Sequence, residues 1–424
     1  MRALPDPIRG VTRACAWRPH PRSGSREGRN DGPVRLYHAD ELPITFAHVG
    51  QALDNLQIID FSRVLAGPLA TMVLADLGAT VTKIERPETG DDTRAWGPPF
   101  DDADQATYFQ AVNRNKTSVA LDLQCAEDLR EARQLVAAAD VVVENFRPGV
   151  MRRLGLDDAT VRPDNPGLIY CSITGFGTGP GGTLPGNDLL VQAVGGLMSI
   201  TGSPDGEPQK VGVALVDVIT GLYASVGILA GLRHRGETGE GQLVEVDLLS
   251  CLLAALTNQG SAYTLAGEVA GRMGNAHPSI SPYEVFASSD GDLVLAVGND
   301  KQFRAMSQSV GRPELADDLR FVTNTARVAN RQILRAELEQ VLRTRPAADW
   351  VESLSAAGVP AGRVNDIAEA FAFAEGLGLD PIVEVPRPDG TVSRLTRNPI
   401  RMSVTPVTYR TAPPPLPERS RSRT

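Results

Sequence analysis

Leu56-Gln-Ile-Ile-Asp-Phe61 is a short, mostly apolar stretch that predicts a β-strand near the start of the folded part of this chain. A helix is expected to follow, because Gly67-Pro68 places proline at an early helical position, where its missing N–H is tolerated. Gly78 is a typical residue just beyond a helix end, and Ala79-Thr-Val-Thr-Lys-Ile-Glu85 predicts the next strand. Strand, short helix and strand form a βαβ unit, which requires a parallel sheet and a right-handed crossover.

The same alternation recurs further along the chain. A helix is predicted over about residues 126–138, followed by strands at Val141-Val-Val143 and Leu168-Ile-Tyr-Cys-Ser-Ile173. Repeated strand–helix units are typical of α/β proteins. The pattern therefore predicts a large, doubly wound, Rossmann-like domain.

In doubly wound sheets, ligands bind at the carboxyl ends of the strands. No G-x-G-x-x-G follows the first predicted strand and no G-x-x-x-x-G-K-[ST] occurs in the chain, so the sequence does not indicate nicotinamide, flavin or P-loop nucleotide binding. Several strand ends carry arginine instead, a side chain that binds phosphate through paired hydrogen bonds. The predicted strand ends are Ser62-Arg63, Glu85-Arg86, Asn145-Phe146-Arg147 and Gly175-Phe176-Gly177.

The second half of the chain predicts long helices and two β-hairpins. Helices are expected from Asp217 to about residue 265, with a break at Gly236–Gly241, and again over residues 301–372. Asp290-Gly291 is the turn signal of the first hairpin. The hairpin strands are Tyr283–Ala287 with Leu293–Val297, and Ile382–Val385 with Thr391–Leu395.

These segments divide the chain into two domains and two tails. A large domain covers residues 51–250 and is completed by about residues 375–410, and a smaller α/β domain covers residues 270–370. Residues 1–50 are rich in Arg, Pro and Gly and predict a disordered extension, with a targeting segment or an upstream start codon as alternatives. Residues 411–424 are expected to form a loose tail.

Composition limits the classes of function. A net charge of −9 argues against nucleic-acid binding, which needs a basic surface. No uninterrupted run of 18 apolar residues occurs, so no membrane segment is predicted. The 4 cysteines and 5 histidines are too dispersed for a metal site or a disulfide framework, which favours a reducing, cytoplasmic location.

Asp217 is the residue with the most direct catalytic potential. It lies in Val213-Ala-Leu-Val-Asp-Val-Ile-Thr-Gly-Leu-Tyr223, after a short apolar run and at the start of a long apolar segment. Such an aspartate is often a helix N-cap, accepting hydrogen bonds from free backbone N–H groups. The alternative is a nucleophilic carboxylate placed within reach of a reactive carbonyl. The local sequence leaves both interpretations open.

Six spaced motifs are Arg63-Val-Leu-Ala-Gly-Pro68, Lys83-Ile-Glu-Arg-Pro87, Asn113-Arg-Asn-Lys116, Val143-Glu-Asn-Phe-Arg-Pro-Gly149, Ser172-Ile-Thr-Gly-Phe-Gly177 and Thr238-Gly-Glu-Gly-Gln242. In this order they resemble the family III CoA-transferases over about residues 50–410. That group includes formyl-CoA:oxalate and carnitine CoA-transferases, with α-methylacyl-CoA racemase as a relative. Within it, Asp91–Phe100 and Met198–Pro208 look most like the succinyl-CoA-dependent dicarboxylate transferases.

The resemblance implies an interlocked homodimer that uses a CoA thioester as substrate, with no permanently bound cofactor and no metal. The family's catalytic aspartate falls on Asp217, whose carboxylate would attack the donor thioester and form a covalent aspartyl intermediate. The expected reaction moves CoA from an acyl-CoA, succinyl-CoA in particular, to a carboxylic acid, expected to be a dicarboxylate. The residues expected to hold CoA are Arg86, Asn145, Phe146 and Arg153.

The main alternative is an α-methylacyl-CoA racemase or epimerase. Those relatives place a histidine thirty residues before the aspartate, where this chain has Asn187. Racemisation needs a second acid–base group and asparagine cannot serve, so Asn187 favours a transferase. Asp188 lies where oxalate-type transferases carry an acidic residue, or it caps a helix that starts at Leu189. A CoA-binding scaffold without turnover is a third hypothesis, which the intact setting of Asp217 disfavours.

Leu65 and His277 are further candidates to line the site. Oxalate-type members carry glutamine at the position of Leu65 and a glycine-rich loop at Gly274–Pro278, so both differences argue against oxalate as the preferred acceptor. His277 is alternatively a loop histidine held by its own backbone. Arg63 and Arg94 are candidates to contact the second carboxylate of a dicarboxylate substrate.

Overall fold

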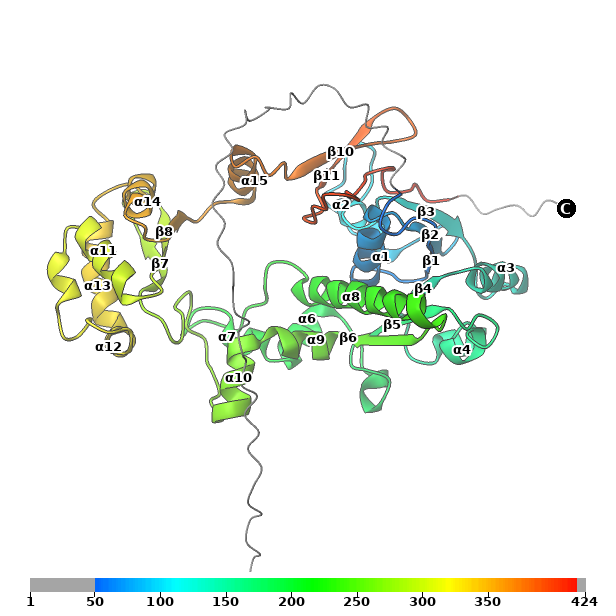
Figure 1. The fold of residues 1–424 in the computed structure, drawn as a ribbon, viewed down its shortest axis with the longest axis horizontal. Coiled ribbons are helices and arrows are strands. Elements are labelled where there is room, and N and C mark those ends of the chain that lie inside the picture. Colours follow the sequence, from blue (N-terminus) through cyan, green and yellow to red (C-terminus); the bar gives the residue numbers. More distant parts are fainter. Residues whose placement is uncertain (1–49, 418–424) are drawn as a thin grey trace, which may run out of the picture. The chain divides into compact units, whose positions relative to one another are not determined.

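The computed structural model describes residues 50–417. Apart from Gly50, the predicted N-terminal extension lies outside the described residues, and so does the part of the predicted C-terminal tail after residue 417. The described chain forms one large parallel sheet, two smaller antiparallel sheets and the helices that pack around them (Figure 1).

A six-stranded parallel sheet confirms the predicted α/β fold. Its order is β3-β2-β1-β4-β5-β6, so the direction in which strands are added reverses between β1 and β4. This is the doubly wound, Rossmann-like order, in which the reversal creates a crevice at the carboxyl ends of the two central strands. The strands are β1 (Gln57–Asp60), β2 (Thr80–Glu85), β3 (Lys116–Ala120), β4 (Val141–Glu144), β5 (Ile169–Thr174) and β6 (Leu243–Asp247).

The two edge strands, β3 and β6, are not among the strands that the sequence predicts. β3 opens with Lys116-Thr-Ser, three polar residues, and β6 follows a long apolar helix closely. An edge strand pairs on one side only and needs less apolar surface than a central strand. Its sequence signal is correspondingly weak.

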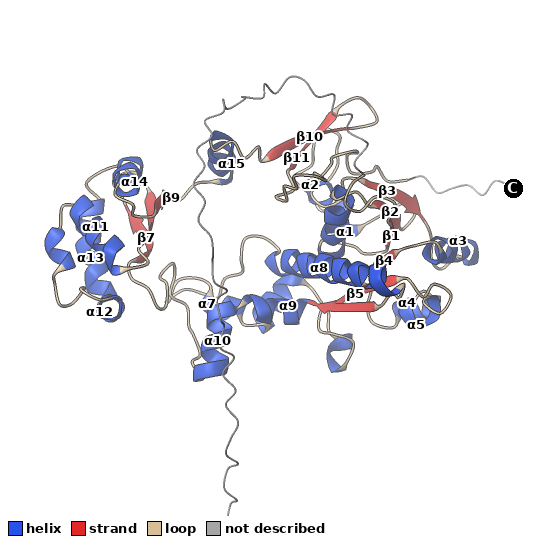
Figure 2. Cartoon of the chain, viewed as in Figure 1, coloured by secondary structure: helices blue, strands red, loops and turns tan. Residues whose placement is uncertain are grey.

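Helices cover both faces of the sheet (Figure 2). Consecutive strand residues point to opposite faces and build two hydrophobic layers. One layer packs with α1 (Ala66–Asp76) and α8 (Leu215–Thr238), and the other with α3 (Ala126–Ala137) and α4 (Val150–Leu154). The buried strand residues include Ile58, Val143 and Cys171 in the first layer, and Ile59, Val142 and Tyr170 in the second.

α8 is 24 residues long and, by length and composition alone, apolar enough to cross a membrane. One of its faces is buried against α1, β5 and β6 in the large hydrophobic core. A long apolar helix with one buried face is common inside globular proteins. The remaining helices of this half are α2 (Thr107–Gln110), α5 (Asp158–Val161), α6 (Asp188–Val194), α7 (Leu197–Ile200), α9 (Leu248–Ala255) and α10 (Thr257–Ala266), with 3₁₀ turns η1 (Asp92–Ala95) and η2 (Pro180–Thr183).

A second hydrophobic core lies entirely within residues 286–361. Its sheet contains the predicted hairpin of β7 (Tyr283–Ala287) and β8 (Asp292–Ala296), which is confirmed. A third strand, β9 (Ala361–Arg363), pairs with β8 and is not predicted, because Ala-Gly-Arg has little strand preference. Helices complete this core: α11 (Asp300–Ser309), α12 (Asn324–Ala329), α13 (Arg331–Leu342) and α14 (Ala347–Ala356), with the 3₁₀ turn η3 (Pro313–Ala316).

The C-terminal segment returns to the large sheet. After α15 (Ile367–Gly376), β10 (Ile382–Pro386) and β11 (Val392–Thr396) form the predicted second hairpin, which is confirmed. The prediction of a loose tail from residue 411 is wrong at its start. Thr411 exchanges two hydrogen bonds with Asn115, and Ala412 is buried, so ordered packing continues past the predicted boundary.

Candidate active site

The turn Ser62–Leu65, between β1 and α1, has a strained backbone at Val64. Hydrogen bonds from other segments hold Ser62, Arg63 and Val64 in place. Val64 has φ of 69°, a left-handed conformation that β-branched residues rarely adopt. Lys83 Nζ donates to the Ser62 carbonyl at 2.7 Å, and Asp91 Oδ1 accepts from the Val64 N–H at 3.3 Å. The Asn145 side chain both accepts from the Arg63 N–H and donates to the Arg63 carbonyl, each at 2.8 Å. Contacts from one strand and two loops therefore fix this turn.

A buried ionic cluster lies beneath the turn. Lys83 pairs with Asp91 at 2.9 Å and Lys116 with Asp60 at 3.1 Å, and none of the four side chains is exposed. Burial alone would raise the pKa of Asp60, but Lys116 and Lys83 hold it at about 2. Burial lowers the pKa of Lys116 to about 8, against the attraction of Asp60. Buried pairs of this kind are costly to break, because the remaining partner is left charged without water.

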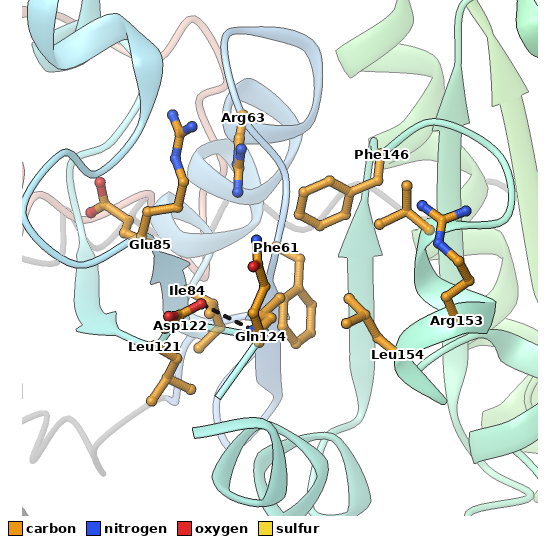
Figure 3. A pocket seen from close by; sticks show the side chains of 13 residues that line it. Phe61, Arg63, Ile84, Glu85, Leu121, Asp122, Gln124, Phe146, Arg153 and Leu154 are labelled. Atoms are coloured by element: carbon orange, nitrogen blue, oxygen red, sulfur yellow. Dashed lines mark hydrogen bonds between the residues drawn. The ribbon is translucent and has the colours of Figure 1, made fainter. Parts of the chain in front are cut away.

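A cavity of about 380 Å³ opens beside the turn, where β1, β2, β3 and β4 end (Figure 3). Its lining combines apolar side chains such as Phe61 with three arginines, Arg63, Arg86 and Arg153. The guanidinium carbon of Arg63 lies 4.9 Å from the centre of the Phe146 ring, also part of the wall. Aromatic and apolar walls with converging arginines suit a ligand that carries both a flat ring and phosphates.

Three of the four residues predicted to hold CoA line this cavity, namely Arg86, Phe146 and Arg153. The fourth, Asn145, does not line it. Its amide is engaged with the backbone of Arg63, so it fixes the turn that carries an arginine of the cavity wall. That Asn145 holds CoA stays a prediction, and the hydrogen bonds that its amide makes depend on the folded loop.

Asp217 is the third residue of α8 and is not its N-cap, so the helix-cap interpretation is wrong. The N-cap position is Ala214, which has no side chain able to cap. The cap comes from another helix: Asp188 Oδ1 accepts from the N–H groups of Val216 at 2.8 Å and Asp217 at 3.3 Å. The proposed capping of α6 by Asp188 is wrong for the same reason, since Asp188 is the first residue of that helix and its carboxylate is directed at α8.

The contact between α1 and α8 fixes the register of α8 and so the direction in which Asp217 faces. A Cβ on Gly221 would lie 2.6 Å from the Ala66 carbonyl oxygen, and Ser225 Oγ donates to the Ala70 carbonyl at 3.5 Å. The two helices therefore run side by side in the same direction. Residues four apart share a helix face, so continuing this register one turn earlier directs the face that carries Asp217 toward Ser62–Leu65. Leu65, predicted to line the site, lies in this turn.

Asp217 sits in an unusual electrostatic environment. Burial and the nearby charge of Asp188 raise its pKa to about 7. Tyr108 of α2 also belongs to this environment, because burial and the charges of Asp217 and Asp188 raise the pKa of its phenol. Its ring packs edge-on against Trp96, with ring centres 5.3 Å apart. Nothing in the local sequence marks Tyr108, which reaches the site from a single-turn helix.

Three other predicted residues lie apart from this arrangement or are engaged elsewhere. Asn187 is exposed at the start of α6. His277 Nδ1 accepts from the Ser279 N–H at 3.1 Å and its ring packs on Tyr283, which fits a loop histidine. Arg94 makes two 2.7 Å hydrogen bonds to Glu85 and covers the Phe109 ring at 3.7 Å, so its guanidinium is not free for a substrate carboxylate. Residues 50–417 contain no group of three His, Cys, Asp or Glu side chains able to hold a metal ion.

The chain is similar to several known proteins. Succinate–glutarate CoA-transferase of Agrobacterium fabrum is 46% identical over 376 residues, covering 86% of this chain and 93% of that protein. Acetyl-CoA:oxalate CoA-transferase of Acetobacter aceti is 44% identical over 319 residues, covering 75% and 82%. A crystal structure of a CAIB/BAIF family protein from Brucella suis superimposes with a TM-score of 0.78 at 44% identity, covering 87% of this chain and 97% of that one. Residues 53–420 match CoA-transferase family III, and the chain therefore belongs to that family of enzymes.

Proposed function

We propose that Asp217 is the nucleophile of CoA transfer. The observation that carries this proposal is the position of Asp217 on α8. It lies four residues before Gly221, which contacts α1, and on the side of α8 that faces the Ser62–Leu65 segment. The same segment borders the arginine-lined cavity through Arg63. A CoA thioester with its phosphates at Arg86 and Arg153 would have its acyl end directed along this turn. A carboxylate there is within reach of the thioester carbonyl.

The reaction follows in four balanced steps. Asp217 attacks the donor carbonyl, the C–S bond breaks, and CoA leaves as a thiolate from a mixed anhydride. The thiolate attacks the Asp217 carbonyl, releasing the donor acid and forming an aspartyl-CoA thioester. The acceptor carboxylate displaces CoA thiolate to give a second anhydride, and the thiolate then attacks the acceptor carbonyl, restoring Asp217. No step requires a proton transfer, so a single carboxylate is sufficient.

We infer that the donor is succinyl-CoA and the acceptor a dicarboxylate. The relatives named for succinate, glutarate and mesaconate support this choice. Leu65 at the strained turn offers an apolar wall, which suits a longer acyl chain better than oxalate does. Because one relative, at 44% identity, is named an acetyl-CoA:oxalate CoA-transferase, oxalate is the acceptor against which dicarboxylates must be compared.

A panel of acceptors with succinyl-CoA as donor tests the function. We expect glutarate to be used with the highest kcat/KM, and oxalate at least about tenfold less well, the discrimination that a few apolar contacts provide. A preference for oxalate would contradict the acceptor assignment. Deuterium incorporation at the α-carbon of a 2-methylacyl-CoA, measured in the same preparations, would instead support a racemase. We expect none, because Asn187 is exposed and supplies no second acid–base group.

Replacing Arg153 with methionine is expected to raise KM for the acyl-CoA about tenfold while changing kcat less than twofold. The arginine lines the cavity and would pair with a phosphate, an interaction made equally in the ground and transition states. Arg152→Met is the matched control, since Arg152 is on the same helix but points to Asp157 and does not line the cavity. Equal effects of the two substitutions on KM would argue against CoA binding in this cavity.

We further propose that two copies of the chain associate. Large apolar side chains are exposed along one stretch of helices, an arrangement that in soluble proteins usually marks an interaction surface. They include Leu222, Tyr223 and Val226 on α8, Leu253 on α9 and Tyr263 on α10. Sedimentation equilibrium tests this proposal, with a particle of twice the 45.2 kDa chain mass as the expected result.

A further inference from the structure

The first turn of α8 depends on a carboxylate from another helix. No side chain of α8's own N-terminal segment caps it, and the N–H groups of Val216 and Asp217 both donate to Asp188 of α6. An uncapped helix start leaves backbone donors unsatisfied and frays readily. Asp217, the proposed nucleophile, therefore lies on a helical turn that is stabilised by Asp188, a residue of another helix.

Asp188 is itself held rigidly. Its second oxygen accepts from Gln192 Nε2 at 2.6 Å, and Gln192 is completely buried. The Gln192 carbonyl oxygen accepts from the Val211 N–H at 2.9 Å, so both ends of the amide are used. This chain of contacts links α6, the segment before α8 and the first turn of α8. The position of the Asp188 carboxylate is consequently fixed by a buried network.

We propose that Asp188 is a positioning residue for CoA transfer, which fixes the first turn of α8 and so holds the Asp217 carboxylate toward the turn Ser62–Leu65. The inference rests on the proposed role of Asp217 as nucleophile. Precise placement of a reacting group accounts for large rate factors, and small displacements are costly. Asp188 acts through Asp217 and needs no contact with the substrate.

The negative charge of Asp188 has a second effect, on the proton affinity of Asp217. The titratable groups near Asp217 are Asp188 on α6 and Tyr108 on α2. Cys251 on α9 lies beside Thr220 of α8, and burial raises the pKa of its thiol. α1 carries no charged residue before Asp76 at its far end. Burial and Asp188 raise the pKa of Asp217 to about 7. Attack requires the ionised carboxylate, so the rate is expected to fall as the pH drops through about 7.

Two substitutions separate the hydrogen bonds to α8 from the charge. Asp188→Asn keeps an oxygen that accepts from the N–H groups of Val216 and Asp217 and removes the negative charge, at the cost of the hydrogen bond from Gln192 Nε2, which then faces the amide nitrogen. We expect kcat at pH 8.5 to stay within about fivefold of the wild type, and the acid limb of the kcat/KM profile to move to lower pH. Asp188→Ala removes both and is expected to lower kcat on the order of 10²-fold, with KM for the acyl-CoA unchanged because the cavity is untouched.

Asp247→Asn is the matched control. Asp247 caps α9 through the Ser250 N–H at 2.8 Å, so the same change is made at a helix cap outside the proposed site. We expect it to leave the acid limb in place. Wild-type kcat in a folded Asp188→Ala enzyme, or an unmoved acid limb in Asp188→Asn, would overturn the proposal. Failure of the underlying function is distinguishable, because it would appear as activity in an Asp217→Asn enzyme.

Discussion

An Asp217→Asn enzyme is expected to lose CoA transfer almost completely, with kcat lower by at least about 10³-fold. The amide has nearly the shape of the carboxylate, and the backbone N–H of residue 217 keeps its hydrogen bond to Asp188. Its nitrogen and oxygen are poor nucleophiles, so no anhydride forms. Because the cavity is unchanged, KM or Kd for the acyl-CoA is expected to stay within about threefold of the wild type. Initial rates of exchange between succinyl-CoA and glutarate measure the effect.

Trapping the intermediate provides the direct observation. Hydroxylamine added after the acyl-CoA donor is expected to convert activated Asp217 to a hydroxamate, found by mass spectrometry in the peptide that contains it. Asp205→Asn, in an exposed loop before α8, is the control and is expected to exchange CoA at the wild-type rate. Exchange by Asp217→Asn at a rate near that of the wild type would rule out the nucleophilic role.

Removing the Asp76 carboxylate is expected to destabilise the protein by about 3–5 kcal/mol, because the substitution leaves a buried arginine without its partner. Asp76, at the end of α1, is fully buried and accepts three hydrogen bonds from the Arg114 guanidinium, at 3.0, 3.2 and 2.6 Å. It also accepts from Asn115 at 2.7 Å and from Asn398 at 3.0 Å. Asp76→Ala breaks all of these contacts at once.

The cluster around Asp76 joins the C-terminal segment to the large sheet. Besides Asn398, the Thr408 N–H donates to the Asp76 carbonyl at 2.9 Å. In Asp76→Ala we therefore expect residues after β11 to become sensitive to limited proteolysis at concentrations that leave the wild type intact. Denaturant unfolding measures the free-energy change. Asp317→Ala serves as control, since its ion pair with Arg304 is exposed and is worth about 0–1 kcal/mol. Similar losses in both variants would refute the assigned role of the cluster.

Local sequence patterns predicted the helices and strands that are specified by residues close together in the chain. The strand of Leu56–Phe61, the helix after Gly67-Pro68 and both hairpins follow from apolar periodicity and turn residues, which act over a few positions. β3 and β6 depend on pairing with β2 and β5, and their own residues carry a weak signal. The order of the sheet likewise depends on contacts between distant segments.

Sequence motifs marked Arg86, Phe146 and Arg153 as a group, and the ends of β2 and β4 together with α4 bring them to one cavity. Local sequence offered helix-cap roles for Asp217 and Asp188 as alternatives to roles in the site, and both cap roles are wrong because neither residue is the N-cap of its own helix. Only the folded structure shows that α6 caps α8. Tyr108 was not predicted at all, since its place near Asp217 results from the path of a loop between β2 and β3.

The sequence by itself determined the α/β class, the family and the residue proposed to carry the chemistry, because these depend on periodicity and on ordered motifs. Tertiary structure alone decided which groups surround Asp217, how the strained turn is held, and how the C-terminal segment attaches to the sheet. The physical reason is that hydrogen bonds and charges act over a few ångströms in space. Asp188 and Asp217 are 29 positions apart in the chain, yet the first holds the backbone of the second.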